Sequence, residues 1–329
     1  MKTLRMIGMA LFAVLMCVNF ASCSSDENDV PQKAEEILVS FGLCDEINVS
    51  ESPLSRTEEK PDLYGIQIYS CPNSLESTTS EYTPFAYGIF DDVSSITASL
   101  LKGYKYKVSI LLIKNGKNIL RVNDYGEYVS PFNAALSNSF TLSTEEAIKP
   151  GHTISYSDGT QYFNDAVEKY YGETTDFIPS DENNSIDIFM KKMFFGGKFI
   201  AENLTEGTLS IIFEEFIAPQ IDIISPETTI QKLFALRDVR SAYNSEDYTN
   251  DIKITLIWTK ADGAEVPLGI YTIQFKRNKL HTIRIKIKEV NSTSGIGIEL
   301  EEGEFEAGDE MIIEDGEIVD TSVGTETEG

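Results

Sequence analysis

The chain has 329 residues, of which 27 are Lys or Arg and 53 are Asp or Glu. This length suggests about two domains, and a hydrophobic content of 41% is that of a globular protein. The net charge of −26 argues against a nucleic-acid partner, because phosphate binding needs clustered basic side chains. With only two histidines, a histidine-based metal or acid–base centre is disfavoured.

The N-terminus predicts a lipoprotein signal peptide over residues 1–22. A basic start precedes an apolar stretch from Met6 to Phe20, which is too short to span a membrane comfortably. Small residues then precede Cys23, whose thiol can take a diacylglycerol, and cleavage before it would leave an acylated N-terminus. The alternative is an ordinary signal peptide cleaved nearby, with Cys23 incidental. Residues 23–35 are polar and predict a tether.

Two further cysteines, Cys44 and Cys71, remain in an oxidising compartment once the signal peptide is removed. Each lies on a predicted strand, on the face opposite to alternating apolar residues. Neighbouring strands could therefore bring the two thiols together as a disulfide. The alternative is two unpaired cysteines, because the strand register is unknown and the geometry of a disulfide is narrow.

The first half of the chain alternates apolar and polar residues with a period of two, which predicts strands. The expected strands cover 36–49, 63–70, 85–90, 96–101, 104–114 and 118–122. Apolar residues between Phe163 and Tyr171 recur at helical spacing and predict one helix. The polar segment 174–184 then gives the boundary between an N-terminal domain over 36–180 and a C-terminal domain over 181–290.

The second half again predicts strands, with a short helix after Ser225 and Pro226. The expected strands cover 185–190, 193–201, 208–216, 252–260, 266–276 and 280–290. Residues 291–329 carry thirteen acidic residues and no Lys or Arg, with short apolar runs at 296–300 and 311–313 that predict possible strands in an acidic tail. The pattern indicates a mainly all-β chain of two tandem β-sandwiches with one or two short helices.

No motif of an enzyme, a metal centre or a cofactor site is present, so a non-enzymatic protein without a cofactor is expected. His152 and His281 have no recognisable partner and are interpreted as a loop residue and a strand residue. The acidic loops 181–184 and 314–317 lack the full pattern of a calcium loop. Trp258 lies in an apolar strand and is expected in the core, not on a sugar-binding surface.

Several of these features together resemble the fimbrillin-like surface lipoproteins. They are the cysteine of the lipoprotein signal, a first strand followed by a loop ending at Arg56 and Thr57, and the hairpin over 271–287. The resemblance implies two transthyretin-like, Greek-key β-sandwich domains. It also implies a type V pilus subunit, an anchor or tip protein, or an adhesin-like relative, lipid-anchored in the outer membrane and facing the cell exterior.

The same resemblance implies a maturation step. Subunits of this kind are exported as lipoproteins and then cut after an arginine, for which Arg56 is the matching position. The cut would remove Cys23 and the first strand, and a strand from another subunit, for example from the tail, would fill the groove by β-augmentation. The alternative is that Arg56 is an ordinary loop arginine.

A second function remains open, that of a surface glycan-binding lipoprotein in a polysaccharide-capture system. It would need exposed aromatic side chains, and tyrosines are frequent in the first domain, although strand alternation already explains several of them. They are Tyr64, Tyr69, Tyr82, Tyr87, Tyr104 and Tyr106. An enzyme is the third and weakest hypothesis, since no nucleophile–base or metal set is visible.

Overall fold

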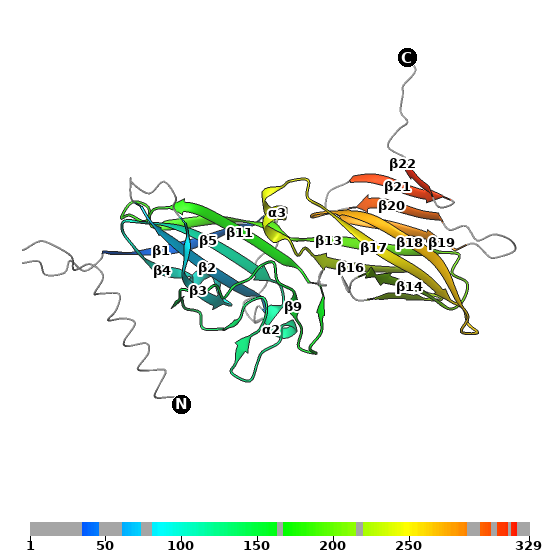
Figure 1. The fold of residues 1–329 in the computed structure, drawn as a ribbon, viewed down its shortest axis with the longest axis horizontal. Coiled ribbons are helices and arrows are strands. Elements are labelled where there is room, and N and C mark those ends of the chain that lie inside the picture. Colours follow the sequence, from blue (N-terminus) through cyan, green and yellow to red (C-terminus); the bar gives the residue numbers. More distant parts are fainter. Residues whose placement is uncertain are drawn as a thin grey trace, which may run out of the picture. The chain divides into compact units, whose positions relative to one another are not determined.

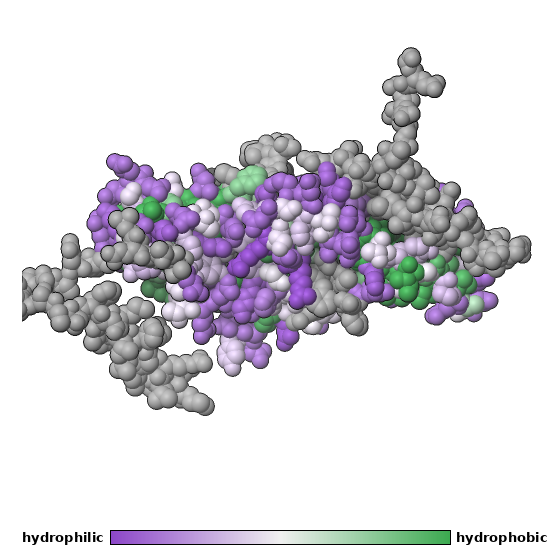
Figure 2. All heavy atoms as spheres, turned by 45° about the horizontal axis from the view of Figure 1, so that its top comes forward, coloured by the Kyte–Doolittle hydropathy of each residue, from purple (hydrophilic) through white to green (hydrophobic). Residues whose placement is uncertain are grey.

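The computed structural model describes residues 35–45, 61–73, 81–162, 167–214, 220–287, 297–303, 308–314 and 317–320 (Figure 1). These residues are mainly in strands, which confirms the all-β expectation. The helices among them are short: η1 (Val93–Ser95), α2 (Gly116–Ile119) and α3 (Val239–Asn244). None of the helices in this described part has the length and apolar character that a membrane span requires. Polar side chains cover most of the face drawn in Figure 2, with smaller apolar areas between them.

The first half of the chain forms an eight-stranded sheet in the order β4-β1-β12-β11-β5-β2-β3-β8. Its strands are β1 (Glu36–Asp45), β2 (Leu63–Pro72), β3 (Thr83–Phe90), β4 (Thr97–Leu101), β5 (Tyr104–Ile113), β8 (Thr141–Leu142), β11 (Lys169–Phe177) and β12 (Ser185–Lys192). β11 and β12 share only two residue pairs, Tyr170 opposite Lys192 and Tyr171 opposite Lys191. Gly172 permits this close approach, because a Cβ there would lie 2.7 Å from the carbonyl oxygen of Phe189.

Strand β2 is buried on both faces, which explains its nearly continuous apolar sequence. One face contributes Ile66 and Ile68 to the main core of this domain. The other face lies under a layer of loops from residues 115–162, whose core includes Phe132 and Ile148. That layer contains α2 and the short pairs β6 (Glu127–Tyr128) with β7 (Ala134–Ala135) and β9 (Ile154–Ser155) with β10 (Gln161–Tyr162).

The second half of the chain forms two sheets around one core. The larger sheet has the order β16 (Thr229–Ala235), β13 (Phe194–Glu202), β19 (Leu280–Lys286), β20 (Gly297–Gly303), β21 (Gly308–Glu314) and β22 (Glu317–Asp320). The smaller has the order β15 (Ile221–Ile224), β14 (Thr208–Phe213), β17 (Thr249–Thr259) and β18 (Glu265–Lys276). Stacked rings of Phe195 and Phe275, 4.6 Å apart, belong to the core.

The helix predicted over 163–171 is wrong where the structure describes this segment. Tyr170 and Tyr171 belong to strand β11, and residues 163–166 lie outside the described residues. β11 pairs with β5 along most of its length and with β12 at its start. Aromatic residues spaced three or four apart fit a helix, but these pairings to two strands outweigh the local periodicity.

The helix predicted after Ser225 and Pro226 is also wrong, because residues 229–235 form strand β16. This strand pairs antiparallel with β13 over seven residue pairs. Its end, Phe234 and Ala235, is buried, whereas Gln231 and Lys232 are exposed. A serine–proline pair favours a helix start, but the pairing with β13 determines the structure here.

Strand β12 lies in the first sheet, although we assigned residues 181–290 to the second domain. The reason is its parallel pairing with β1, which a sequence pattern does not reveal. The two halves are joined where β12 continues into β13. There Tyr170 packs in the first core while the adjacent Tyr171, on the other face of β11, packs in the second.

Candidate functional site

The first strand, β1, is enclosed by strands on both sides. It pairs antiparallel with β4, from Glu36 opposite Leu101 to Ser40 opposite Thr97. On its other side it pairs parallel with β12 over six residue pairs. The first half of β1, residues 36–40, thus pairs with β4 and its second half, residues 40–45, with β12. Removing β1 would leave β12 with an unpaired edge and take from β4 its neighbour in the sheet.

The side chains of β1 alternate between the core and the surface. Ile37, Val39 and Phe41 are 7%, 0% and 6% exposed, whereas Leu38 between them is 65% exposed. The ring of Phe41 contacts Phe140, with centroids 5.9 Å apart. Loss of β1 would thus open an apolar groove in this core as well as two sheet edges.

The residues predicted for lipidation and cleavage, Cys23, Arg56 and Thr57, lie outside the described residues. The described chain stops at Asp45, the end of β1, and resumes at Pro61, just before β2. Arg56 therefore lies in the connection that follows β1. A cut in this connection would separate β1 from the rest of the domain.

The two remaining cysteines lie on strands that are not neighbours. Cys71 is a free thiol, 1% exposed, on β2. Cys44 lies on β1, and its side chain is outside the described residues. The sheet order places β12, β11 and β5 between these two strands.

The two histidines occupy different environments. His281 is fully buried on β19, where its Nε2 accepts the backbone N–H of Lys276 at 2.9 Å. Burial, with the positive charges of Lys276 and Lys279 nearby, lowers the pKa of His281 to about 4. His152 is exposed in a loop. Among the described residues, no group of three or more His, Cys, Asp or Glu side chains could hold a metal ion.

The aromatic residues weighed for sugar binding are mostly covered. Trp258 is 5% exposed, and its indole N–H donates to the carbonyl oxygen of Glu206 at 2.9 Å. Tyr69 and Tyr106 are buried, and burial raises the pKa of Tyr106 to about 12. The other four tyrosines considered from the sequence are half-buried. These six tyrosines therefore form no row of exposed rings.

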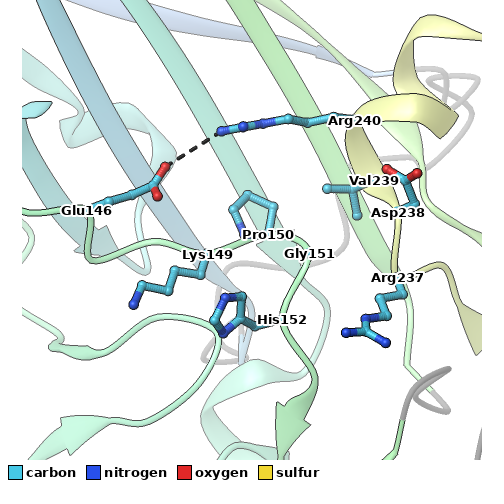
Figure 3. A pocket seen from close by; sticks show the side chains of 9 residues that line it. All are labelled: Glu146, Lys149, Pro150, Gly151, His152, Arg237, Asp238, Val239 and Arg240. Carbon is cyan, nitrogen blue, oxygen red and sulfur yellow. Dashed lines mark ion pairs between the residues drawn. The ribbon is translucent and has the colours of Figure 1, made fainter. Parts of the chain in front are cut away.

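A polar cleft lies where the loop over 146–152 meets the segment 237–240 at the start of α3 (Figure 3). Its volume is about 240 Å³. It is lined by Glu146, Lys149, Pro150, Gly151, His152, Arg237, Asp238, Val239 and Arg240. Sequence reasoning missed this site, apart from considering His152 by itself, because its two segments are almost 90 residues apart and carry no motif.

Comparison with known proteins gives structural matches only. No protein-family model and no curated protein sequence matches the chain. The fimbrial anchor protein Mfa2 from Porphyromonas gingivalis matches with a TM-score of 0.34 and 10% identity, over 87% of this chain and 98% of that one. A predicted cell adhesion protein from Bacteroides eggerthii matches with a TM-score of 0.32 and 10% identity, over 84% and 97%.

A predicted polysaccharide-binding protein from Bacteroides thetaiotaomicron also matches, with a TM-score of 0.36 and 9% identity, over 87% of this chain and 97% of that one. Each of these TM-scores is below 0.5 and each identity is about a tenth. The matches alone therefore fix no function for this chain.

Proposed function

We propose that this chain is a cell-surface subunit of a fimbrial system, acting as a structural, anchor or adhesin-like protein. It is exported as a lipoprotein and held in the outer membrane through acylated Cys23, facing the cell exterior. Cleavage after Arg56 removes β1, and a strand from another subunit then takes its place. The position of β1 carries this proposal, because it lies between two strands and fills the core with Ile37, Val39 and Phe41.

The geometry supports exchange in two ways. The vacated edges of β4 and β12 would offer backbone groups to an incoming strand, and the groove between them would accept alternating apolar side chains. The tail strands β20 and β21 are candidate donors, since both contain alternating or consecutive apolar residues. In this structure β20 pairs with β19 of the same chain over seven residue pairs, so a donating tail would first have to leave that edge.

Native processing tests the proposal. The full chain is produced on the surface of a Gram-negative host that carries the fimbrial system, and the purified protein is analysed by intact mass and N-terminal sequencing. We expect a chain beginning at Thr57 that forms heat-stable ladders on a gel. Arg56→Ala should retain acylated Cys23 and stay monomeric, while Lys60→Ala, in the same connection, should be processed like the wild type.

A different result would overturn parts of the proposal. A wild-type chain that still begins at Cys23 and runs as a monomer contradicts strand exchange, although a lipid-anchored anchor protein would remain. A wild-type chain that carries no acyl group at Cys23 before cleavage contradicts the membrane anchor. Equal processing of the Arg56→Ala variant contradicts cleavage at this position.

A further inference from the structure

The outer face of the four-stranded sheet in the second half is apolar at its centre. Strands β14, β17 and β18 lie side by side in this sheet (Figure 1). Every second residue of these strands packs into the core, and the residues between them point to the opposite face. A solvated sheet face normally carries polar side chains. Here it carries Ile212, Thr255, Ile257, Pro267 and Ile270, which we call the outer patch.

The strand register joins these five residues into one surface. Ile212 lies opposite Thr255, which in turn lies opposite Ile270, so the three form a row across the strands. In the adjacent row Ile257 lies opposite Pro267. Ile270 is 65% exposed, Pro267 is exposed, and the other three are half-buried. Adjacent apolar side chains of this kind mark an interaction surface more often than isolated ones do.

Charge surrounds the outer patch but does not enter it. The net charge of −26 makes two copies of the chain repel each other wherever acidic surfaces meet, and an uncharged patch avoids this. The two ends of the patch carry opposite charges. Lys253, whose side chain is 61% exposed, lies two positions before Thr255, and Glu265 lies opposite Thr259 at the other end. Glu214 is 3.8 Å from Lys253, but a pair this exposed contributes little and leaves Lys253 open to a second acid.

This arrangement of charges makes the face complementary to itself. Two sheets that pack face to face keep their strands roughly aligned. A two-fold axis that runs across the strands makes the two copies antiparallel, and it brings Lys253 of each copy to the Glu265 end of the other. An axis along the strands would instead bring the two Lys253 side chains together. The antiparallel contact also closes after two copies, because both contribute the same surface.

We propose that the outer patch docks a second copy of this chain, in an antiparallel, two-fold contact between the two four-stranded sheets. The isoleucines form its centre, and Lys253 faces Glu265 of the second copy at both ends. The proposal goes beyond the fimbrial role, since it depends on neither Cys23 nor β1. Such a dimer dissociates in detergent, so it is distinct from the heat-stable ladders that strand exchange would give.

Sedimentation velocity tests the contact on the mature chain from residue 23, with Cys23→Ser to exclude association through lipid. We expect a reversible shift from monomer to dimer over roughly 1–300 μM, because a contact of a few side chains is smaller than that of a stable complex. Ile270→Asp should weaken the dimer at least about tenfold, because it places an unpaired carboxylate in the contact. Leu142→Asp is the matched control, since Leu142 is 74% exposed on β8 of the first sheet, and it should leave the dimer unchanged.

Charge reversal tests the direction of the contact. Lys253→Glu and Glu265→Lys should each weaken the dimer about fivefold, because each turns two symmetry-related attractions into repulsions. The chain with both substitutions keeps the net charge of the wild type and restores opposite charges across the contact. It should therefore dimerise within about twofold of the wild type.

Three outcomes would overturn the proposal. A chain that stays monomeric over the whole range has no such contact, and an unchanged dimer in Ile270→Asp uses another surface. A double variant that does not regain the affinity contradicts the antiparallel arrangement. Thermal unfolding followed by circular dichroism shows that each variant is folded. Lys253 and Glu265 are exposed, so their variants test the contact even where Ile270→Asp lowers the unfolding midpoint.

Discussion

The side-chain oxygen of Gln67, on β2, accepts the backbone N–H of Ala147 at 3.0 Å. The same oxygen lies 3.3 Å from the N–H of Ile148, and the amide nitrogen of Gln67 donates to the carbonyl oxygen of Ala86 at 3.1 Å. Gln67 is fully buried. One side chain thus attaches the loop that lines the cleft to the middle of the first sheet.

Gln67→Leu should destabilise the fold by roughly 2–4 kcal/mol, because it leaves two buried N–H groups and one carbonyl without a partner. Urea unfolding followed by circular dichroism measures this. Gln274→Leu is the matched control, since Gln274 is exposed and its amide nitrogen donates to Asp251 at 3.0 Å at the surface, so the substitution should cost little stability. An equal loss of unfolding free energy in the two variants would contradict the claim that the buried hydrogen bonds of Gln67 stabilise the fold.

Phe41→Ala should destabilise the fold by roughly 3–5 kcal/mol, because it leaves a cavity between β1 and Phe140. Leu38→Ala removes an apolar side chain from the same strand that is 65% exposed, so it should change stability by less than about 0.5 kcal/mol. Thermal unfolding of both variants makes the comparison. A large cost at Leu38 would show that the outer face of β1 is covered.

His281 should make stability depend on pH. The folded pKa of about 4 lies below the ordinary value of 6.5, so the unfolded chain binds more protons between these two pH values. Stability from this residue is fully present above pH 6.5 and is lost as pH falls toward 4, by roughly 3 kcal/mol in total. Unfolding in urea across pH 4–8 measures it. The His281→Gln variant should lose less stability over this range, and a parallel dependence in both chains would contradict the assignment.

Gly172→Ala should destabilise the first domain by roughly 1–3 kcal/mol through overpacking. Its added methyl group would lie 2.7 Å from the backbone carbonyl oxygen of Phe189, which cannot move without disturbing β12. Thermal unfolding measures the cost. An unchanged midpoint of thermal unfolding would contradict this, because it would mean that β11 and β12 can move apart at Gly172 without a loss of stability.

Strand positions were predictable from sequence where alternation was strong. Ile283, Ile285 and Ile287 face the core of the second half, and β19 begins at Leu280 as expected. The strand over Tyr170 and Tyr171 was not predicted, because its sequence does not alternate between apolar and polar residues. The two side chains lie on opposite faces of β11, and each packs into a different core, so both positions carry a large aromatic residue. A strand between two cores shows no clean alternation, so helical spacing arises by chance.

Pairings between strands that are distant in the chain could not be predicted from the sequence. The parallel pair of β1 and β12 joins segments about 145 residues apart, and this pairing places β12 in the first sheet. The cleft was hidden for the same reason, since its two segments, 146–152 and 237–240, are far apart in the sequence. Charges in exposed loops carry no period that would point to one another.

The parallel pairing of β1 with β12 has a mechanical consequence. A pull on the chain before Glu36, opposed by a pull after Lys192, draws the two strands past each other along their length. The backbone bonds of the six register pairs, from Ser40 opposite Ser185 to Asp45 opposite Met190, then share the load at once. Antiparallel neighbours pulled apart from one end would break their bonds one after another. Tension along this path therefore loads the pair of β1 and β12 in shear, the direction in which it resists separation best.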